Sequence, residues 1–402
     1  MKEKFIPADT QNFDRRQRFI ILHYTVLDEK DSIETLTRGG VGAHFLIPKQ
    51  SFIDGEENFD YYQFVKIEDR AWHAGVSNFA GRSGLNDTSI GIEIVNYGYG
   101  LKQDSGQVLF TYQVENQLKE VIIETLKKED EALFQLLERE KLLTAFLSDI
   151  QRSLVPPADR KAYKEKVSTD LIKKYKQLTQ EWRIINDPFI NIAQKDLYSL
   201  EQQCKLIWDE YTEHQIDSLV YLIKNIQQQL TIKDEKNGEV YYQIPPQLIT
   251  GHIDIAPGRK TDPGPRLWKK LADRGIGAWP DEQLVATIEK EIHIDRGIDY
   301  KWIQDNLRLY GYNIKSTGKF DEQTQDVIRA FQIHFEPEAY SGEPSAKTIS
   351  LLEALIKKYY PNQQADYPRA FKPSDEKKSN FFREVRVNRI NPANPLNCCV
   401  IS

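Results

Sequence analysis

The segment GHIDIAPGRKTDPGP, residues 251–265, places three side chains that could do chemistry in one short stretch: His252, Lys260 and Asp262. Three prolines and three glycines lie among them. Because Pro fixes φ and Gly permits positive φ, this composition is typical of chain that holds a rigid, non-repetitive course. An imidazole nitrogen and a carboxylate oxygen suit Zn²⁺, which in catalytic sites takes three protein ligands and keeps one position for water.

Two residues from separate apolar segments could complete such a site. His23 lies near the end of RFIILHYT, residues 18–25, and could supply the third ligand. Glu93 alternates with the isoleucines of SIGIEIVN, so it faces the side opposite to theirs. A metal that activates water needs a carboxylate to accept the proton, which suits Glu93. The Lys260 ammonium could stabilise the oxyanion that forms when a carbonyl is attacked.

Each of these residues also has a simpler explanation. A His in a strand is more often a hydrogen-bonded core residue than a metal ligand. A lone Glu can face solvent on a one-sided sheet, and a loop rich in Pro and Gly that holds Asp and Lys is usually a surface turn. Spacing alone therefore leaves a metal-dependent hydrolase and these structural roles open.

Hydrophobic periodicity predicts the elements that must position these residues. We expect strands at 18–25, 41–50, 60–75 and 88–98, with SFIDG at 51–55 as a hairpin-like turn. Apolar residues at helical spacing predict amphipathic helices over 112–207, broken at VPPAD, and a further helix at 213–230. Three short helices are expected between 299 and 360, followed by a polar, irregular tail.

Composition limits the classes of protein to which the chain can belong. Its 402 residues allow two or three domains, and 40% hydrophobic with 28% charged residues is typical of a soluble globular protein. A net charge of -6 gives no reason to expect nucleic acid as a partner. No apolar run approaches the roughly 20 residues that span a bilayer, and no Sec signal peptide is visible. Three cysteines cannot form a disulfide framework, so we expect folding in a reducing compartment such as the cytoplasm.

In this order, the motifs ILHYT, HFLIP, AWHAG, SIGIEIVN and GHIDIAPGRKTDPGP closely resemble those of the bacterial zinc-dependent N-acetylmuramoyl-L-alanine amidases. The fold of that family is shared with the peptidoglycan recognition proteins. The resemblance covers about 1–100 and 205–280. It implies an α/β protein whose central mixed β-sheet is flanked by helices, with a large helical insertion and a small three-helix C-terminal domain.

The resemblance also implies a role for each candidate residue. The zinc ligands of the family fall on His23, His252 and Asp262, its acid/base glutamate on Glu93 and its catalytic lysine on Lys260. Three further residues are candidates for contact with substrate, although no specific motif marks them. Trp72 could present an aromatic face, His73 could form part of the pocket wall, and Arg259 could pair with a carboxylate. A packing role would explain Trp72 and His73 equally well, and bracing of the loop is the favoured role for Arg259 and Asp254. His44 is expected to be structural.

A second resemblance covers about 296–360, where IQDNLRLYGYNIKSTGKFDEQTQDVIRAFQIHF is similar to a three-helix peptidoglycan-binding domain. Its alternative is a small helical packing unit that needs no ligand. We therefore predict an amidase domain over 1–295, a peptidoglycan-binding-like domain over 296–362 and a flexible tail over 363–402.

The helical insertion at 103–205 departs from the usual pattern of the family. Because it follows the segment that carries Glu93, it could project near the cleft mouth and either gate the site or recruit a protein partner. A helical hairpin without a role in catalysis is at least as good an explanation.

The last residues, NCCVIS, form the second departure. Cys399-Val400-Ile401-Ser402 fits the C-a-a-X prenylation pattern, with Cys398 beside it as a palmitoylation site. Prenylation is eukaryotic whereas peptidoglycan is bacterial, so we expect a bacterial effector delivered into a host cell and anchored to a host membrane.

The sequence thus predicts zinc-dependent hydrolysis of the amide between N-acetylmuramic acid and L-alanine, in peptidoglycan or muropeptides. A non-catalytic muropeptide-binding or scaffolding protein on the same fold is the main alternative. An amidase that acts on a different amide is a third, because pocket shape rather than the ligands decides specificity.

Overall fold

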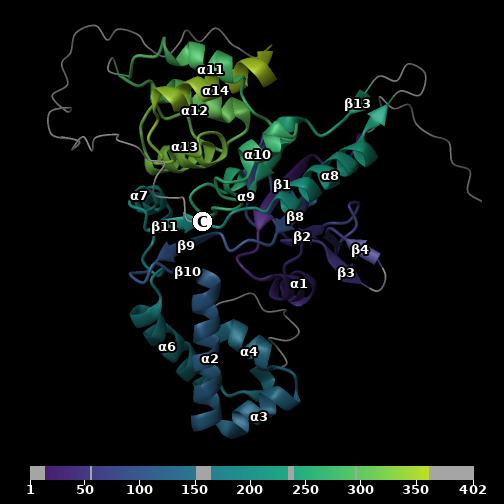
Figure 1. The fold of residues 1–402 in the computed structure, drawn as a ribbon, viewed down its shortest axis with the longest axis vertical. Helices are drawn as coiled ribbons and strands as arrows, with labels where there is room; N and C mark the ends of the chain where they lie inside the picture. The colour runs from purple at the N-terminus through teal and green to yellow at the C-terminus, as the bar shows by residue number, and fades with distance from the viewer. Residues whose placement is uncertain (1–13, 55–56, 151–163, 234–239, 295–296, 362–402) are drawn as a thin grey trace, which may run out of the picture.

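The structure is a computed structural model that describes residues 14–54, 57–150, 164–233, 240–294 and 297–361. The predicted helix break VPPAD and the tail with Cys398 and Cys399 lie outside the described residues. Along the long axis of the molecule, the C-terminal helices and the helical insertion lie at opposite ends, with the central sheet between them (Figure 1).

The central sheet has five strands in the order β14 (Ile249–Gly251), β1 (Phe19–Tyr24), β8 (Ser89–Ile94), β2 (Phe45–Ile47) and β5 (Tyr62–Gln63). The first four run parallel and β5 pairs antiparallel at the edge. All six residues of β1 are buried, as expected for a parallel strand covered on both faces. The mixed sheet flanked by helices confirms the predicted fold class.

The two faces of the sheet are covered differently. On one face, alternate residues such as Ile20 and Ile92 pack against α8 (Glu213–Leu230) and α10 (Trp268–Asp273). The opposite face meets α1 (Glu29–Arg38) at one end, where Leu36 packs on Leu46, and the C-terminal helices at the other, where Ile21 is buried. His23 and Glu93 lie on this second face, between α1 and the C-terminal helices.

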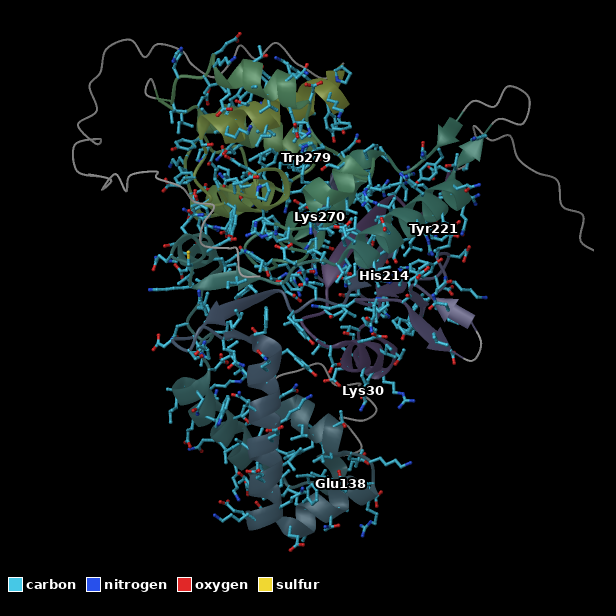
Figure 2. All side chains as sticks on the ribbon, in the orientation of Figure 1. Lys30, Glu138, His214, Tyr221, Lys270 and Trp279 are labelled. Atoms are coloured by element: carbon cyan, nitrogen blue, oxygen red, sulfur yellow. The ribbon has the colours of Figure 1, made fainter. Side chains whose placement is uncertain are left out.

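The helical insertion has its own core. At its root, β10 (Val108–Phe110), β9 (Tyr99–Lys102) and β11 (Leu206–Trp208) form an antiparallel sheet in that order. Beyond it, α2 (Thr111–Glu129), α3 (Glu131–Arg139), α4 (Leu143–Ile150) and α6 (Thr169–Asn186) pack around buried side chains that include Phe146 and Tyr175, and α7 (Leu197–Gln202) leads back. Glu138 marks the far end of this body (Figure 2). The insertion therefore folds around contacts of its own.

The C-terminal helices α12 (Tyr300–Tyr310), α13 (Glu322–Phe335) and α14 (Ala346–Tyr359) confirm the three predicted helices, and α11 (Glu282–Glu289) packs on α14. Every residue of α13 from 327 to 335 is buried. A helix buried on all sides lies inside a core rather than at a surface. One hydrophobic cluster joins these helices to Phe19, Ile21 and Ile253 of the amidase-like part.

Four predictions of secondary structure need correction. The segment 41–50 forms a strand only at Phe45–Ile47, and 60–75 forms only the short edge strand β5. SFIDG is not a turn, because Phe52–Asp54 is β3, which pairs with β4 (Glu57–Phe59). The segment 251–265 is not wholly irregular, since α9 (His252–Ile255) forms one helical turn within it. The remaining hairpins are β6 (Asn78–Phe79) with β7 (Arg82–Ser83) and β12 (Ile232–Lys233) with β13 (Val240–Tyr242).

Among the helices of the described ranges, none combines the length and the apolar character needed to cross a membrane.

Candidate metal centre

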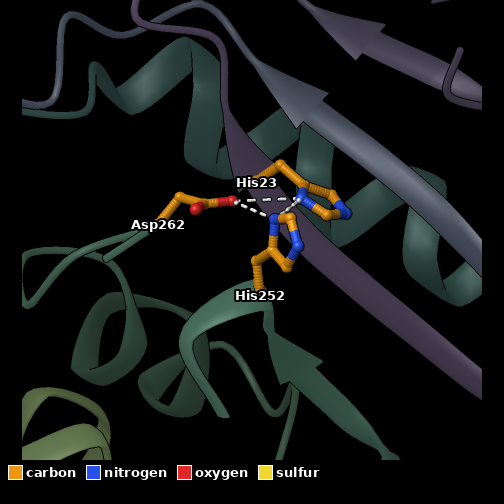
Figure 3. A group of neighbouring side chains, drawn as sticks. All are labelled: His23, His252 and Asp262. Carbon is orange, nitrogen blue, oxygen red and sulfur yellow. Dashed lines mark hydrogen bonds and ion pairs between the residues drawn. The ribbon is translucent and has the colours of Figure 1, made fainter. Parts of the chain in front are cut away.

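Three buried side chains meet at one point beside the carboxyl end of β1 (Figure 3). His23 Nδ1 lies 2.9 Å from His252 Nδ1 and 3.0 Å from Asp262 Oδ2. The third side of the triangle, from His252 Nδ1 to Asp262 Oδ2, is also 3.0 Å. The structure therefore brings together the three residues predicted as ligands, from segments that lie up to 239 positions apart.

Parallel pairing of β14 with β1 places two of the ligands. The register pairs Leu22 with Gly251, so the residues that follow, His23 on β1 and His252 at the start of α9, emerge at the same edge of the sheet. The chain then turns through α9 and returns, and the Ile253 N–H donates to the Asp262 carbonyl at 2.9 Å. This backbone hydrogen bond places Asp262 beside α9, so that its carboxylate lies next to the two imidazoles.

Side chains of the sheet and its loops hold the returning segment in place. The hydroxyls of Tyr24 and Thr261 are 2.5 Å apart. The Tyr211 hydroxyl donates to the Pro263 carbonyl at 2.7 Å. The segment that carries Lys260 and Asp262 is thus fixed from both ends.

A chain of hydrogen bonds assigns the tautomer of His23. The Ser89 hydroxyl donates to the Leu85 carbonyl at 2.6 Å, so Ser89 Oγ accepts from His73 Nε2–H at 3.1 Å. Burial, followed by repulsion from His23 and other imidazoles, holds the pKa of His73 well below its usual value, so the ring is neutral and its Nδ1 is an acceptor. The donor across the 3.0 Å contact is then His23 Nε2–H. The Nδ1 of a neutral His23 carries a lone pair toward His252 and Asp262.

These atoms fit a bound cation. Tetrahedral Zn²⁺ with ligands at about 2.0–2.1 Å holds its ligand atoms about 3.3 Å apart, close to the sides of this triangle. Two lone pairs, on His23 and Asp262, face each other with no proton between them, an arrangement that a cation relieves. In the part of the chain that the structure describes, His252 Nε2 and Glu93 Oε2 are also buried without a hydrogen-bond partner.

The environment keeps His23 and Asp262 deprotonated, as metal binding requires. Burial and the nearby His252 lower the pKa of His23 to about 4, although Asp262 opposes this. Burial would raise the pKa of Asp262, but His252 and His23 outweigh it and hold that pKa well below its usual range. At neutral pH, His23 therefore offers a lone pair and Asp262 a charged oxygen.

Glu93 and Lys260 complete the predicted set. Glu93 pairs in register with His23 on the neighbouring parallel strand, so the two side chains share a face of the sheet. Burial, with repulsion from Asp262, raises the pKa of Glu93 to about 8, while Lys260 opposes the shift. Lys260 lines the same pocket, and its carbonyl accepts a hydrogen bond from the Gln194 side chain of the insertion.

A half-open pocket of about 450 Å³ leads to these groups. α1 and the 97–99 segment form its walls, and Thr111, the first residue of α2, lines it as well. Among the described residues of the insertion, Thr111 alone lines the pocket.

The residues predicted for substrate contact differ in position. Trp72 is 56% exposed at the pocket lip, with the Arg70 guanidinium 4.2 Å from its ring centre. Arg259 is exposed, lines the pocket and donates to the Val76 carbonyl. His73 also lines the pocket, but it is buried and faces His23.

Sequence reasoning missed the contact between His73 and His23, which lie 50 positions apart, because the contact depends on how distant segments pack. One signal was present. Gly91 alternates with isoleucines in β8, and a Cβ there would lie 2.4 Å from the His73 ring. His44, expected to be structural, accepts the Gly91 N–H at 3.0 Å and so joins β2 to β8.

Comparisons with known proteins show to which family the chain is similar. The family model for N-acetylmuramoyl-L-alanine amidase matches residues 13–133 and 153–265, and that for a peptidoglycan binding domain matches 296–352. The N-acetylmuramoyl-L-alanine amidase AmiD of Escherichia coli is 28% identical over 86% of this chain and 84% of its own length.

Two solved structures are also similar. AmpDh3 of Pseudomonas aeruginosa has a TM-score of 0.55 and 28% identity, covering 90% of this chain and 99% of its own. AmiD of E. coli, in complex with the substrate anhydro-N-acetylmuramic acid-L-Ala-D-γ-Glu-L-Lys, has a TM-score of 0.54 and 26% identity, covering 88% and 93%.

The tautomer assignment predicts the effect of changing His73. His73→Ala removes the acceptor for His23 Nε2–H and should lower Zn²⁺ affinity by about 10- to 100-fold, as loss of a partner behind a ligand does. His73→Asn can place Oδ1 where Nδ1 accepts and should recover part of that loss. Competition with a chromophoric chelator measures the affinity, with His214→Ala on α8 as the control. Equal affinity in all four proteins would contradict the assignment.

The raised pKa of Glu93 predicts how pH affects the metal-free protein. Glu93 keeps its proton in the fold up to about pH 8, whereas the unfolded chain ionises near 4.5, so the stability that this group contributes is lost as pH rises between these values. Glu93→Gln cannot ionise, so its advantage in melting temperature over wild type should grow from pH 5 to pH 8.

Thermal melting of the two metal-free proteins at both pH values measures this difference, with Glu138→Gln at the far end of the insertion as the matched control. Added Zn²⁺ should shrink the difference, because a nearby cation favours the ionised carboxylate. An advantage that is the same at pH 5 and pH 8 would show that Glu93 does not titrate as described.

Proposed function

Because the chain belongs to the N-acetylmuramoyl-L-alanine amidase family, we propose that it hydrolyses the amide between the lactyl group of N-acetylmuramic acid and L-alanine. The observation that carries the proposal is the meeting of His23, His252 and Asp262 in a pocket that also holds Glu93 and Lys260. The mapping of all five onto the motifs of the family, in order, supports the same conclusion.

In the proposed reaction, His23, His252 and Asp262 hold Zn²⁺. When bound, Zn²⁺ supplies Lewis acidity, which makes water nucleophilic near neutral pH. Glu93 accepts the proton of the attacking water and later gives it to the leaving nitrogen of L-alanine. A carboxyl whose pKa lies near 8 without metal holds a proton readily, which suits the second of these steps. The Lys260 ammonium stabilises the negative charge that develops on the amide oxygen.

We propose soluble muropeptides or peptidoglycan as the substrate class. The exposed ring of Trp72 could pack on a sugar or on the peptide stem, and the exposed guanidinium of Arg259 could pair with a peptide carboxylate. That AmiD has been solved with an anhydromuramyl peptide supports the smaller substrate as a first choice for assay.

Cleavage of a defined anhydromuramyl tripeptide, followed by mass spectrometry, tests this function. Zinc-loaded protein should release the free tripeptide, and a chelator should abolish release until Zn²⁺ is restored. Glu93→Gln should lower kcat by about 10²- to 10⁴-fold, as loss of a general base does, while zinc content stays at the wild-type level. Glu138→Gln, the same change far from the pocket, should cleave normally.

Other outcomes favour the rival functions. Tight binding of the tripeptide by zinc-loaded protein without any cleavage would favour a muropeptide-binding or scaffolding protein. Cleavage of a different amide in the same assay, with the muramyl bond intact, would favour an amidase of other specificity.

Lipidation at Cys399 and delivery into a host cell remain predictions from sequence, since these residues lie outside the described part of the chain. A partner on the insertion is likewise a prediction. In animal cells, the tagged chain should associate with membranes, and Cys399→Ser should release it to the cytosol. A wild-type chain that is fully cytosolic would remove the anchoring prediction, whatever its amidase activity.

A further inference from the structure

The one-turn helix α9, which carries His252, is held by a buried carboxylate two residues along. Asp254 Oδ2 accepts hydrogen bonds from the Gly251 N–H and the Thr250 hydroxyl, both at 2.8 Å. These contacts fix the start of α9 to the end of β14. Asp254 has no exposed surface, so its remaining acceptor positions must be satisfied by protein.

Both remaining partners come from the C-terminal helical segment. The Tyr312 hydroxyl, just beyond α12, donates to Asp254 Oδ1 at 2.5 Å. His334 Nδ1, near the end of α13, lies 2.8 Å from Asp254 Oδ2. Tyr312 is 1% exposed and His334 is 3% exposed, so these are interior contacts rather than surface ones. The carboxylate beside a predicted metal ligand is thus satisfied in part by a segment that matches a different domain family.

The C-terminal helical segment also packs closely around the loop from β14 to Asp262, both directly and through Trp268. The His334 ring stacks on Trp268 of α10 at 3.6 Å between ring centres. A Cβ added at Gly251 would lie 2.9 Å from that same Trp268 ring. Farther along the loop, a Cβ at Gly258, which has a φ of +75°, would lie 2.4 Å from Asp326 Oδ2 of α13. The loop from β14 to Asp262 therefore lies against α13 with no room to shift toward it.

Buried carboxylates of this kind tolerate loss of a partner poorly. Removing a hydrogen-bond donor from a buried carboxylate leaves an oxygen desolvated and unpaired, so the surrounding chain moves to find water or another donor. Here the chain that would move is α9 with His252, because Asp254 and His252 share a single helical turn. A displacement of about 1 Å is enough to spoil ligand geometry.

We propose that Tyr312 and His334 are positioning residues for the metal site, which hold Asp254 and through it keep His252 where it can ligate. The C-terminal segment is then a structural part of the active site rather than an independent module for wall attachment. This inference rests on the proposed metal site, and it says which residues outside the site keep His252 in place.

Zn²⁺ affinity of the full chain, measured by chelator competition without substrate, tests the proposal. His334→Ala and Tyr312→Phe should each weaken affinity by about 10-fold or more, in line with the loss of partners behind a ligand. His334→Asn should stay within about 3-fold of wild type, because its Nδ2–H can occupy the position of the His Nδ1–H donor. Tyr312→Phe removes a single hydroxyl, so it keeps the test open if His334→Ala fails to fold.

A matched control separates positioning from general stability. Leu352→Ala in α14 creates a cavity in the same helical segment, at a residue that is 1% exposed. It should lower the melting temperature at least as much as Tyr312→Phe, yet leave Zn²⁺ affinity unchanged below the transition.

Three results would overturn the proposal. Wild-type affinity in folded His334→Ala and Tyr312→Phe would show that Asp254 needs neither partner. Equal weakening by Leu352→Ala would show that the effect is only structural. A wild-type chain that does not bind Zn²⁺ at all would remove the metal site itself, and this inference with it.

Discussion

The constraint on which the molecule depends is the convergence of two imidazoles and a carboxylate at one buried point. Their ligand atoms lie within about 3 Å of one another, at distances of 2.9, 3.0 and 3.0 Å. Without a cation, the lone pairs of His23 and Asp262 face each other in this cluster, so the fold must hold the three side chains together. Parallel pairing of β14 with β1 brings two ligands to the same sheet edge, and one backbone hydrogen bond from Ile253 to Asp262 returns the third.

Behind each ligand, a different part of the chain supplies a partner. His23 is oriented by His73 and Ser89 from the segment around β8, and His252 is held through Asp254 by the C-terminal helices. The loop that carries Lys260 also accepts a hydrogen bond from Gln194, at the returning end of the insertion. The site therefore lies where the central sheet, the helical C-terminal segment and the root of the insertion meet. This explains why α13 is buried on every side from 327 to 335.

Much of this could be predicted from sequence, because local patterns carry it. The apolar residues of β1 and β8, the amphipathic α8 and the three C-terminal helices all follow from periodicity. The alternation in SIGIEIVN places Glu93 opposite the isoleucines. The motif order predicted the three residues that meet at this point. Contacts at long range could not be predicted. Nothing local links His73 to His23, or His334 to Asp254, and the short β5 within 60–75 reflects an edge position that propensity does not encode.

Anomalous diffraction at the zinc edge, from crystals of the zinc-loaded full chain, tests the central claim most directly. The account predicts one strong peak at a position shared by Nδ1 of His23, Nδ1 of His252 and the carboxylate of Asp262, at ligand distances of about 2.0–2.2 Å. A peak at another place, or none at this one in fully loaded crystals, would show that the three side chains converge for a structural reason and would contradict the account.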